Sequence, residues 1–189
     1  MKLILAMFLA ALLSGCVFNS QKVNLLPTVS SLASSDGDGI TVAVTVQDER
    51  PDQSIGKRGV GGAGAVIEAA QSPELVVRSA VIDGLKKKGF TIVEKGNANA
   101  DLSIEVRFLQ YSLSQGFWSG GINIKVAFKA LASKGSQKYE HLYRVDKEHR
   151  VQFAPTAETN EKWINEALSV AINELLDDRG LIDTLKFKG

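Results

Sequence analysis

Cysteine is almost absent from this chain of 189 residues, since Cys16 is the only one. No disulfide can therefore form within one molecule. Histidine is nearly as scarce, because His141 and His149 are the only two and neither belongs to a metal-binding spacing. No serine lies in a nucleophile-elbow pattern, since Ser119 lacks the flanking glycines of that motif. These absences predict no metal site and no catalytic residues, and we expect the protein not to be an enzyme.

An excess of charge of one sign is also missing. The chain has 22 Lys and Arg against 21 Asp and Glu, which gives a formal net charge of only +1. Nucleic-acid-binding domains usually carry a basic surface, so we expect no nucleic-acid partner. Beyond the N-terminus no segment is apolar enough to cross a bilayer. An apolar content of 44% over this length predicts one globular domain, which we place at residues 40–189.

What the chain does have is a short apolar run that leads directly to its cysteine. Lys2 precedes the apolar residues 3–13, and the small residues Ser14 and Gly15 stand just before Cys16. These are the parts of a secretory signal peptide, and the apolar run is too short to span a bilayer as a helix. The sequence therefore predicts an exported protein.

Residues 13–16, with the sequence Leu-Ser-Gly-Cys, resemble a bacterial lipobox. The resemblance implies that the signal peptide, residues 1–15, is removed and that the thiol and amino group of Cys16 are acylated, palmitate being a typical acyl group. Two or more acyl chains make membrane attachment effectively stable. The alternative is an ordinary signal peptide with a coincidental cysteine.

The residue after the cysteine helps to determine the membrane to which a bacterial lipoprotein is delivered. In Gram-negative lipoproteins an aspartate there retains the protein in the inner membrane, whereas this chain has Val17. By that resemblance we expect a lipid-anchored protein of the outer membrane that faces the periplasm. In a Gram-positive cell the same protein would stand on the outer face of the only membrane.

Residues 16–39 are rich in Ser, Asn and Gly and end in the turn-forming string Asp36 to Gly39, which is typical of a tether. A flexible linker of this length has a root-mean-square span of roughly 25 to 30 Å. Val23, Leu25 and Leu26 precede Pro27 and offer a short edge strand, since proline is tolerated at a strand end.

Alternation of apolar and polar residues predicts the strands of the domain. They are expected at residues 40–46, 90–93, 102–108, 122–130 and 139–145. A helix is expected between the N-cap Ser72 and Gly89, and a second one follows Thr156 or Thr159 and ends at Gly180. The last three strands are joined by Gly-rich turns, so we predict an α+β fold: a mainly antiparallel sheet of four or five strands with two helices packed on one face.

The chain resembles the YajG-like lipoproteins of proteobacteria over nearly its whole length. The residues that carry the resemblance are the lipobox, the segment Val-Gln-Asp-Glu-Arg at 46–50, the Ile55–Gly56 pair and the helical unit from Ser72 to Phe90. The family is uncharacterised in mechanism. The resemblance therefore implies a location in the outer membrane and a fold, but it does not imply any chemical reaction.

Gly59, Gly61 and Gly64 have the spacing of a dinucleotide-binding loop, but we predict no cofactor. Such a loop must follow its strand at once and open a helix, and here about a dozen residues intervene after the preceding strand. A mobile loop is the simpler interpretation. The alternative is an anion-binding nest of backbone amides supported by Lys57 and Arg58.

Two further pairs are candidate contact sites. Asp48 and Arg50 point to the same side of an extended chain, where they form either a structural clamp for the next loop or a contact for an anionic or peptide ligand. Phe117 and Trp118 lie in a Gly-rich hairpin, where they either contact a partner or fold back over the edge of the core.

Two classes of function remain. The first is a non-enzymatic envelope lipoprotein that acts as a binding or adaptor module for a protein or another envelope component. The second is a carrier or transport accessory that shelters a small apolar or anionic ligand between helices and sheet, which needs a pocket of several hundred Å³. A filled core favours the first class, and a deep apolar cavity favours the second.

Overall fold

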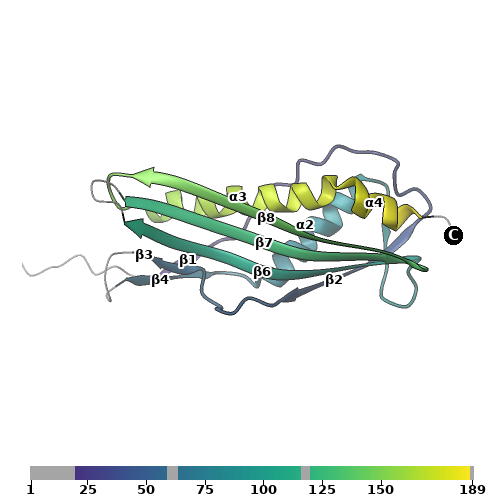
Figure 1. Cartoon of the computed structure of the whole chain (residues 1–189), viewed down its shortest axis with the longest axis horizontal. Coiled ribbons are helices and arrows are strands. Elements are labelled where there is room, and N and C mark those ends of the chain that lie inside the picture. Colours follow the sequence, from purple (N-terminus) through teal and green to yellow (C-terminus); the bar gives the residue numbers. More distant parts are fainter. Residues whose placement is uncertain (1–19, 59–63, 116–119, 188–189) are drawn as a thin grey trace, which may run out of the picture.

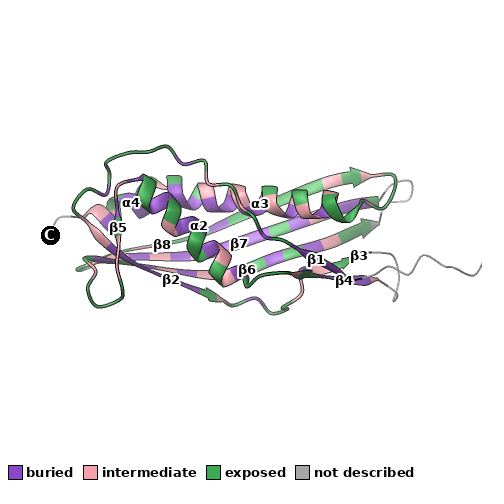
Figure 2. Cartoon of the chain, turned by 180° about the vertical axis from the view of Figure 1, so that it is seen from behind, coloured by how far each residue is buried: buried purple, intermediate pink, exposed green. Residues whose placement is uncertain are grey.

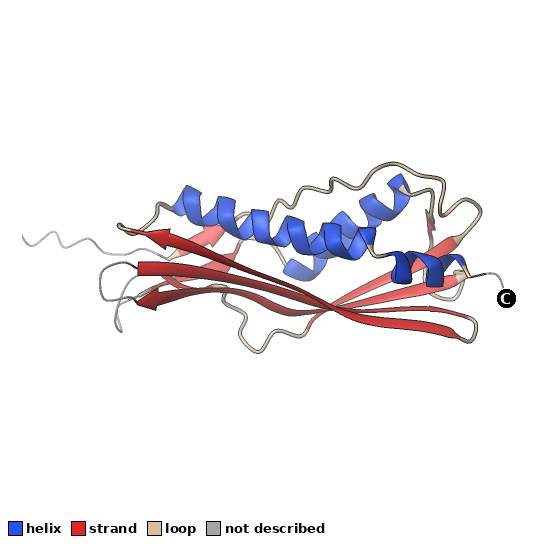
Figure 3. Ribbon diagram, turned by 45° about the horizontal axis from the view of Figure 1, so that its top comes forward, coloured by secondary structure: helices blue, strands red, loops and turns tan. Residues whose placement is uncertain are grey.

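The architecture is taken from a computed structural model that describes residues 20–58, 64–115 and 120–187. Over these residues one mixed sheet of eight strands carries three helices on one of its faces (Figures 1 and 3). In chain order the elements are β1 (Gln21–Val23), β2 (Thr41–Asp48), β3 (Gly56–Arg58), β4 (Ala65–Ala69), α2 (Pro73–Lys87), β5 (Thr91–Ile92), β6 (Ala100–Gln115), β7 (Gly120–Lys134), β8 (Gln137–Val151), α3 (Ala157–Asp177) and α4 (Arg179–Lys186).

The long strands β6, β7 and β8 form an antiparallel meander, as their alternating sequences predict. β6 pairs with β7 from Asp101↔Ser133 to Gln115↔Gly120, and the register shifts once, between Val106 and Phe108. A bulge of this kind turns the following side chain toward the other face, which leaves Phe108 41% exposed on the side without helices.

The second edge of β6 is shared by two sets of short strands. β2 runs parallel to the first half of β6, from Val42↔Ala100 to Asp48↔Val106, and β5 lies beyond it. β3 takes over further along β6, where Gly56 pairs with Tyr111, and β4 and β1 follow outward. A Cβ on Gly56 would come within 2.0 Å of the Tyr111 backbone oxygen, so only glycine fits at this junction.

The predicted fold class was wrong in three respects. The sheet has eight strands rather than four or five, it is mixed rather than mainly antiparallel, and three helices pack on it instead of two. The chain returns from β2 to β6 through α2, and such a crossover makes the two strands parallel. Strands β1, β3 and β5 have only two or three residues, too few to show a period.

The helix ends follow the capping rules, with one correction. The Ser72 hydroxyl accepts from the Leu75 amide at the start of α2, and Thr156 caps α3 in the same way. Gly180 was predicted to end the last helix, but α3 already ends at Asp177 and Gly180 lies inside α4. The carboxylate of Asp178 starts that new helix by accepting from the amides of Gly180 and Leu181.

Buried residues of the helices and of the long strands form one core between the two layers, and Figure 2 colours these buried residues purple. The largest fully buried ones come from all layers and include Phe128, Ile124 and Leu102 from the sheet and Leu168 and Ile172 from α3. α2 and α3 approach closely at Gly84, where a Cβ would lie 2.3 Å from a Leu176 methyl carbon. At this contact only a residue without a side chain leaves room for the Leu176 methyl group.

Candidate functional site

The segment of residues 24–31, here called the strap, lies along α3 although the sequence predicted a tether there. It is extended, and its burial alternates: Leu25 and Ser31 are buried while the residues at even positions are exposed. The strap follows β1, which pairs with β4 and includes Val23 but not Leu25 or Leu26 of the predicted edge strand. From Gln21 onward the chain is thus in contact with the domain.

Side chains of α3 hold the strap by its backbone amides. Four hydrogen bonds repeat at regular steps: Asn24 N to Glu161 Oε2 at 2.8 Å, Leu26 N to Asn165 Oδ1 at 2.6 Å, Thr28 N to Ser169 Oγ at 2.9 Å, and Ser30 N to Asn173 Oδ1 at 2.8 Å. Two of the same side chains also donate to strap carbonyls, Asn165 to Asn24 O at 2.8 Å and Asn173 to Thr28 O at 2.9 Å. We call this set the ladder.

The ladder works because two periods coincide. Two residues of an extended chain advance roughly 6.5 Å, and four residues of an α-helix advance about 6 Å. Every second strap amide therefore meets every fourth side chain of α3. Short polar side chains such as those of asparagine and serine suit these positions, because they reach the strap backbone without extending beyond it.

The other edge of the strap faces a groove of about 570 Å³, whose opposite wall is α2. It is lined by Leu25, Leu26, Pro27 and Val29 of the strap and by Val76, Ser79, Ala80, Asp83, Lys86 and Lys87 of α2. The Leu26 side chain is 67% exposed there. Pro27 has no amide hydrogen, so at this point the strap offers the groove only a carbonyl. The groove combines an apolar floor with a charged rim at the C-terminal end of α2.

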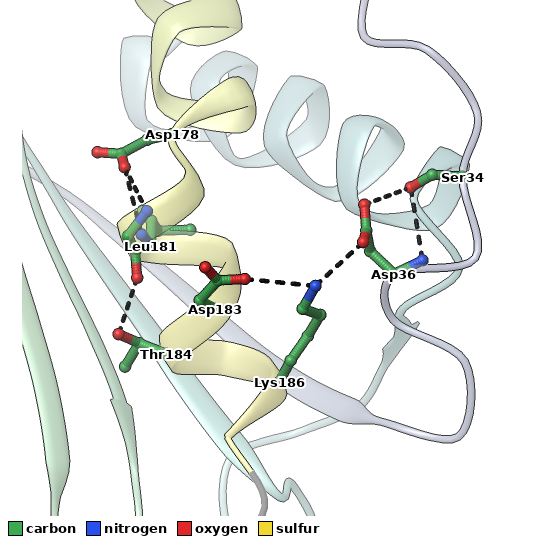
Figure 4. Close-up of polar contacts among 8 residues, drawn as sticks. Ser34, Asp36, Asp178, Leu181, Asp183, Thr184 and Lys186 are labelled. Atoms are coloured by element: carbon green, nitrogen blue, oxygen red, sulfur yellow. Dashed lines mark hydrogen bonds and ion pairs between the residues drawn. The ribbon is translucent and has the colours of Figure 1, made fainter.

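Polar contacts also fix the chain just after the strap (Figure 4). The Lys186 ammonium of α4 contacts Asp36 Oδ1 at 3.1 Å and Asp183 Oδ1 at 3.3 Å, and the Ser34 hydroxyl donates to Asp36 Oδ2 at 2.7 Å. The hydrogen bonds from Ser34 and then from Lys186 hold the pKa of Asp36 below its ordinary value. These contacts are solvent-exposed, so they orient the loop more than they stabilise the fold.

Asp178 joins the helix layer to β8. Its Oδ2 accepts from the hydroxyls of Tyr139 at 2.9 Å and Tyr143 at 2.6 Å, while Oδ1 accepts from the amides that start α4. Burial alone would raise the pKa of Asp178, but the tyrosine and amide hydrogen bonds outweigh it and the pKa lies below its ordinary value. The pKa of Tyr143 is raised by burial and by the same contact.

Asp48 and Arg50 meet as the sequence predicted, in a two-pronged ion pair. Arg50 Nε lies 2.8 Å from Asp48 Oδ1, and Nη2 lies 2.8 Å from Oδ2. The Arg50 side chain is 3% exposed, and its Nη1 has no partner among the described residues. Burial would raise the pKa of Asp48, but the Arg50 hydrogen bonds and charge lower it overall. Arg50 also lines a cavity of about 70 Å³.

Several predicted site residues lie outside the described part of the chain. They are the lipid-attachment residue Cys16, Gly59 and Gly61 of the Gly-rich loop, and the hairpin aromatics Phe117 and Trp118. The structure does describe Lys57 and Arg58, which end β3, and Gly64, which precedes β4.

Both histidines lie on β8, as part of the strand. His141 stands between Tyr139 and Tyr143, with ring centroids 6.1 and 4.8 Å away. His149 stacks on Trp163 of α3 at 4.0 Å and 7° between the ring planes. Desolvation lowers the pKa of His149. Within residues 20–58, 64–115 and 120–187, no three His, Cys, Asp or Glu side chains gather as a metal site would require.

The helices in the described ranges include none with the length and apolarity needed to cross a membrane.

Asn165, Ser169 and Asn173 were not predicted as contact residues, although the sequence contains a signal for them. They recur every four residues along one side of a helix whose apolar stripe is elsewhere, and each has a low helix propensity. Side chains that weaken a helix at regular steps indicate a partner along that side.

A model of a lipoprotein family, described as "uncharacterized lipoprotein", matches residues 27–186. A search of curated proteins found no match. The crystal structure of protein XCC0632 from Xanthomonas campestris is similar with a TM-score of 0.60 at 14% identity, covering 83% of this chain and 93% of that one. Lipoprotein GNA1162 from Neisseria meningitidis has a TM-score of 0.37 at 11% identity, covering 74% and 99% of the two chains.

The first similarity supports the observed fold, and the family match agrees with the resemblance to YajG-like proteins. A lipoprotein family indicates a membrane-associated place in the cell envelope. The match covers well over half of the chain and includes most of the strap, most of the residues that line the groove and the three described helices. The chain therefore belongs to this family of uncharacterised lipoproteins.

Proposed function

We propose that this protein is a lipid-anchored, non-enzymatic adaptor that binds an extended segment of a protein partner in the groove between the strap and α2. The observation that carries the proposal is the contrast between a filled core and an open groove. Buried side chains form a continuous core between sheet and helices, and the groove of about 570 Å³ lies outside that core, along α2.

The composition of the groove favours a peptide over a small sheltered molecule. The groove is open to solvent along its length and has both apolar and charged walls, whereas carriers bury most of their ligand's surface. Leu26 is an exposed apolar contact that a partner would cover, and Lys86 with Asp83 could pair with a partner's charges. The neighbouring strap already shows that this layer of helices accommodates an extended chain.

We propose further that the anchor is an acylated Cys16 and that the protein sits in the outer membrane and faces the periplasm. The lipobox and Val17 support this address, together with membership of a lipoprotein family. Replacing Cys16 by Ser should move the protein from the membrane fraction to the soluble fraction and change its electrophoretic mobility. Retention of the variant in the membrane with unchanged mobility would contradict the anchor.

The groove is tested by a photo-crosslinking amino acid placed at Ser79 in intact cells. Ser79 lines the groove, and Glu140 on the opposite face of the sheet is an exposed control position. We expect an adduct from position 79 that is absent from position 140 and disappears when Leu26→Glu is added. An adduct that survives Leu26→Glu, or equal adducts at both positions, would exclude the groove as the binding site.

Tight, saturable binding of a small molecule would favour the second class of function, a carrier or transport accessory. Native mass spectrometry of the protein released gently from membranes would detect it as a defined added mass. The adaptor proposal expects no such mass beyond the lipid.

A further inference from the structure

Several strands begin or end at the same end of the sheet. β6 ends at Gln115, where it pairs with Gly120 at the start of β7, and Gly120 pairs in turn with Val151 at the end of β8. β3 runs in the direction of β6, so its last residue, Arg58, points to the same end. We call this end of the sheet the anchor end.

The N-terminal strand begins at this end as well. β1 runs parallel to β4, and β4 starts at Ala65 opposite Arg58, so Gln21, the first residue of β1, lies on the side of the anchor end. Gln21 is held there by the start of α3: its Nε2 donates to Ala157 O at 2.7 Å, and its Oε1 accepts from Asn160 Nδ2 at 3.1 Å. Figure 1 shows β1, β3 and β4 beside the ends of the long strands.

The length of chain between Cys16 and Gln21 limits how far the domain can stand from a lipid on Cys16. Five residue steps separate Cys16 from Gln21, which reach at most about 17 Å when fully extended. The ladder and the pairing of β1 prevent the strap from lengthening this link. A free tether of residues 16–39 would let the domain tumble, but the bound strap holds the anchor end close to the lipid.

Phe153 lies at this end and is largely exposed. It follows the last residue of β8 by two positions, and its side chain is 84% exposed. Exposed aromatic side chains are favourable at the boundary between headgroups and acyl chains.

We propose that the anchor end rests on the bilayer that holds the lipid of Cys16, with Phe153 inserted into its interfacial layer. This inference depends on the proposed lipid anchor, and the partner is the membrane surface itself. The orientation directs the long axis of the sheet away from the membrane, so that the strap, α2 and the groove are presented to the periplasm beyond the headgroups.

The test compares two introduced cysteines in the lipidated protein bound to vesicles of phosphatidylethanolamine and phosphatidylglycerol. Phe153→Cys reports on the anchor end, and Leu32→Cys is the matched control, because both native side chains are 84% exposed. Leu32 lies toward the other end, where Ser34 N contacts Lys87 O of α2. Acylation of Cys16 leaves the new thiol as the only one available to a fluorescent label.

Quenching of the label by iodide is measured on vesicles and, for reference, with Cys16→Ser versions that stay in solution. We expect vesicles to reduce quenching about threefold or more at position 153 and to leave it unchanged at position 32, since interfacial residues lie 5–10 Å deep. Gln152→Cys, also exposed, provides a second position at the same end.

Flotation of the vesicles separates the two proposals. If the protein floats but iodide reaches both positions equally, the anchor stands and the docked orientation is wrong. If the protein does not float, the lipid anchor is wrong, and the docked orientation, which depends on the anchor, is wrong as well.

Discussion

Removing the ladder should release the strap without unfolding the domain. The perturbation is the double substitution Asn165→Ala and Asn173→Ala. These two side chains make four hydrogen bonds to the strap backbone, to the amides of Leu26 and Ser30 and to two carbonyls. At about 1 kcal/mol net each, their loss costs about 4 kcal/mol. Alanine has a higher helix propensity than asparagine, which stabilises α3 by about 1 kcal/mol over the two positions. The net destabilisation of the bound strap is therefore about 3 kcal/mol.

The assay is amide hydrogen exchange followed by peptide or residue. A local destabilisation of about 3 kcal/mol accelerates exchange of strap amides roughly a hundredfold, because each 1.4 kcal/mol is a factor of ten. Amides in the pairing between β6 and β7 should keep their protection. Glu174→Ala is the matched control, since Glu174 is an exposed residue of the same helix and is not one of the ladder residues.

Two results would refute the reasoning. If strap amides of the double variant exchange as slowly as before, the side-chain hydrogen bonds do not hold the strap. If instead the midpoint of denaturant unfolding falls by the full amount and all amides accelerate together, the strap is part of the global cooperative unit, not a segment that opens separately.

Three further predictions concern the fold and the hairpin. Gly56→Ala should lower the free energy of unfolding by about 3 kcal/mol or more in denaturant titration, since a Cβ there collides with the Tyr111 backbone, which cannot move aside as a side chain could. Because the folded state lowers the pKa of Asp178, its ionised form contributes stability that is fully present above the ordinary value of 3.8 and is lost as pH falls below it. Unfolding measured from pH 5 to pH 2 should show an acid loss of stability that is smaller in Asp178→Asn, and the remainder comes from Asp36 and Asp48, whose pKa values are lowered too. Replacing Phe117 and Trp118 by Ser should remove a crosslinked partner while thermal unfolding is unchanged if they contact it, and a loss of several kcal/mol would place them in the core instead.

The sequence allowed some elements to be predicted because their causes are local. The alternation predicted strands at residues 102–108, 122–130 and 139–145, and all three lie within β6, β7 and β8. It did not predict the bulge after Val106, which leaves Phe108 exposed although Ile104 and Val106 are buried. The caps Ser72 and Thr156 act on amides three residues away. The pair of Asp48 and Arg50 is also local, since two residues on an extended chain point to the same side.

Other features could not be predicted because their causes lie far along the chain. β3 and β5, with three and two residues, exist only because β6 and β2 offer them unpaired edges. Asp178 was not recognised as the start of a helix, since its role depends partly on tyrosines 35 and 39 residues earlier.

The sequence by itself determined the lipobox, the long strands, the two main helices and the family to which the chain belongs. Each of these is written in contiguous residues. Only the tertiary structure decided that the sheet is mixed and that the supposed tether is bound. The strap amides meet their partners 137 to 143 residues away in the chain, and only a folded α3 places those side chains at the spacing of an extended backbone.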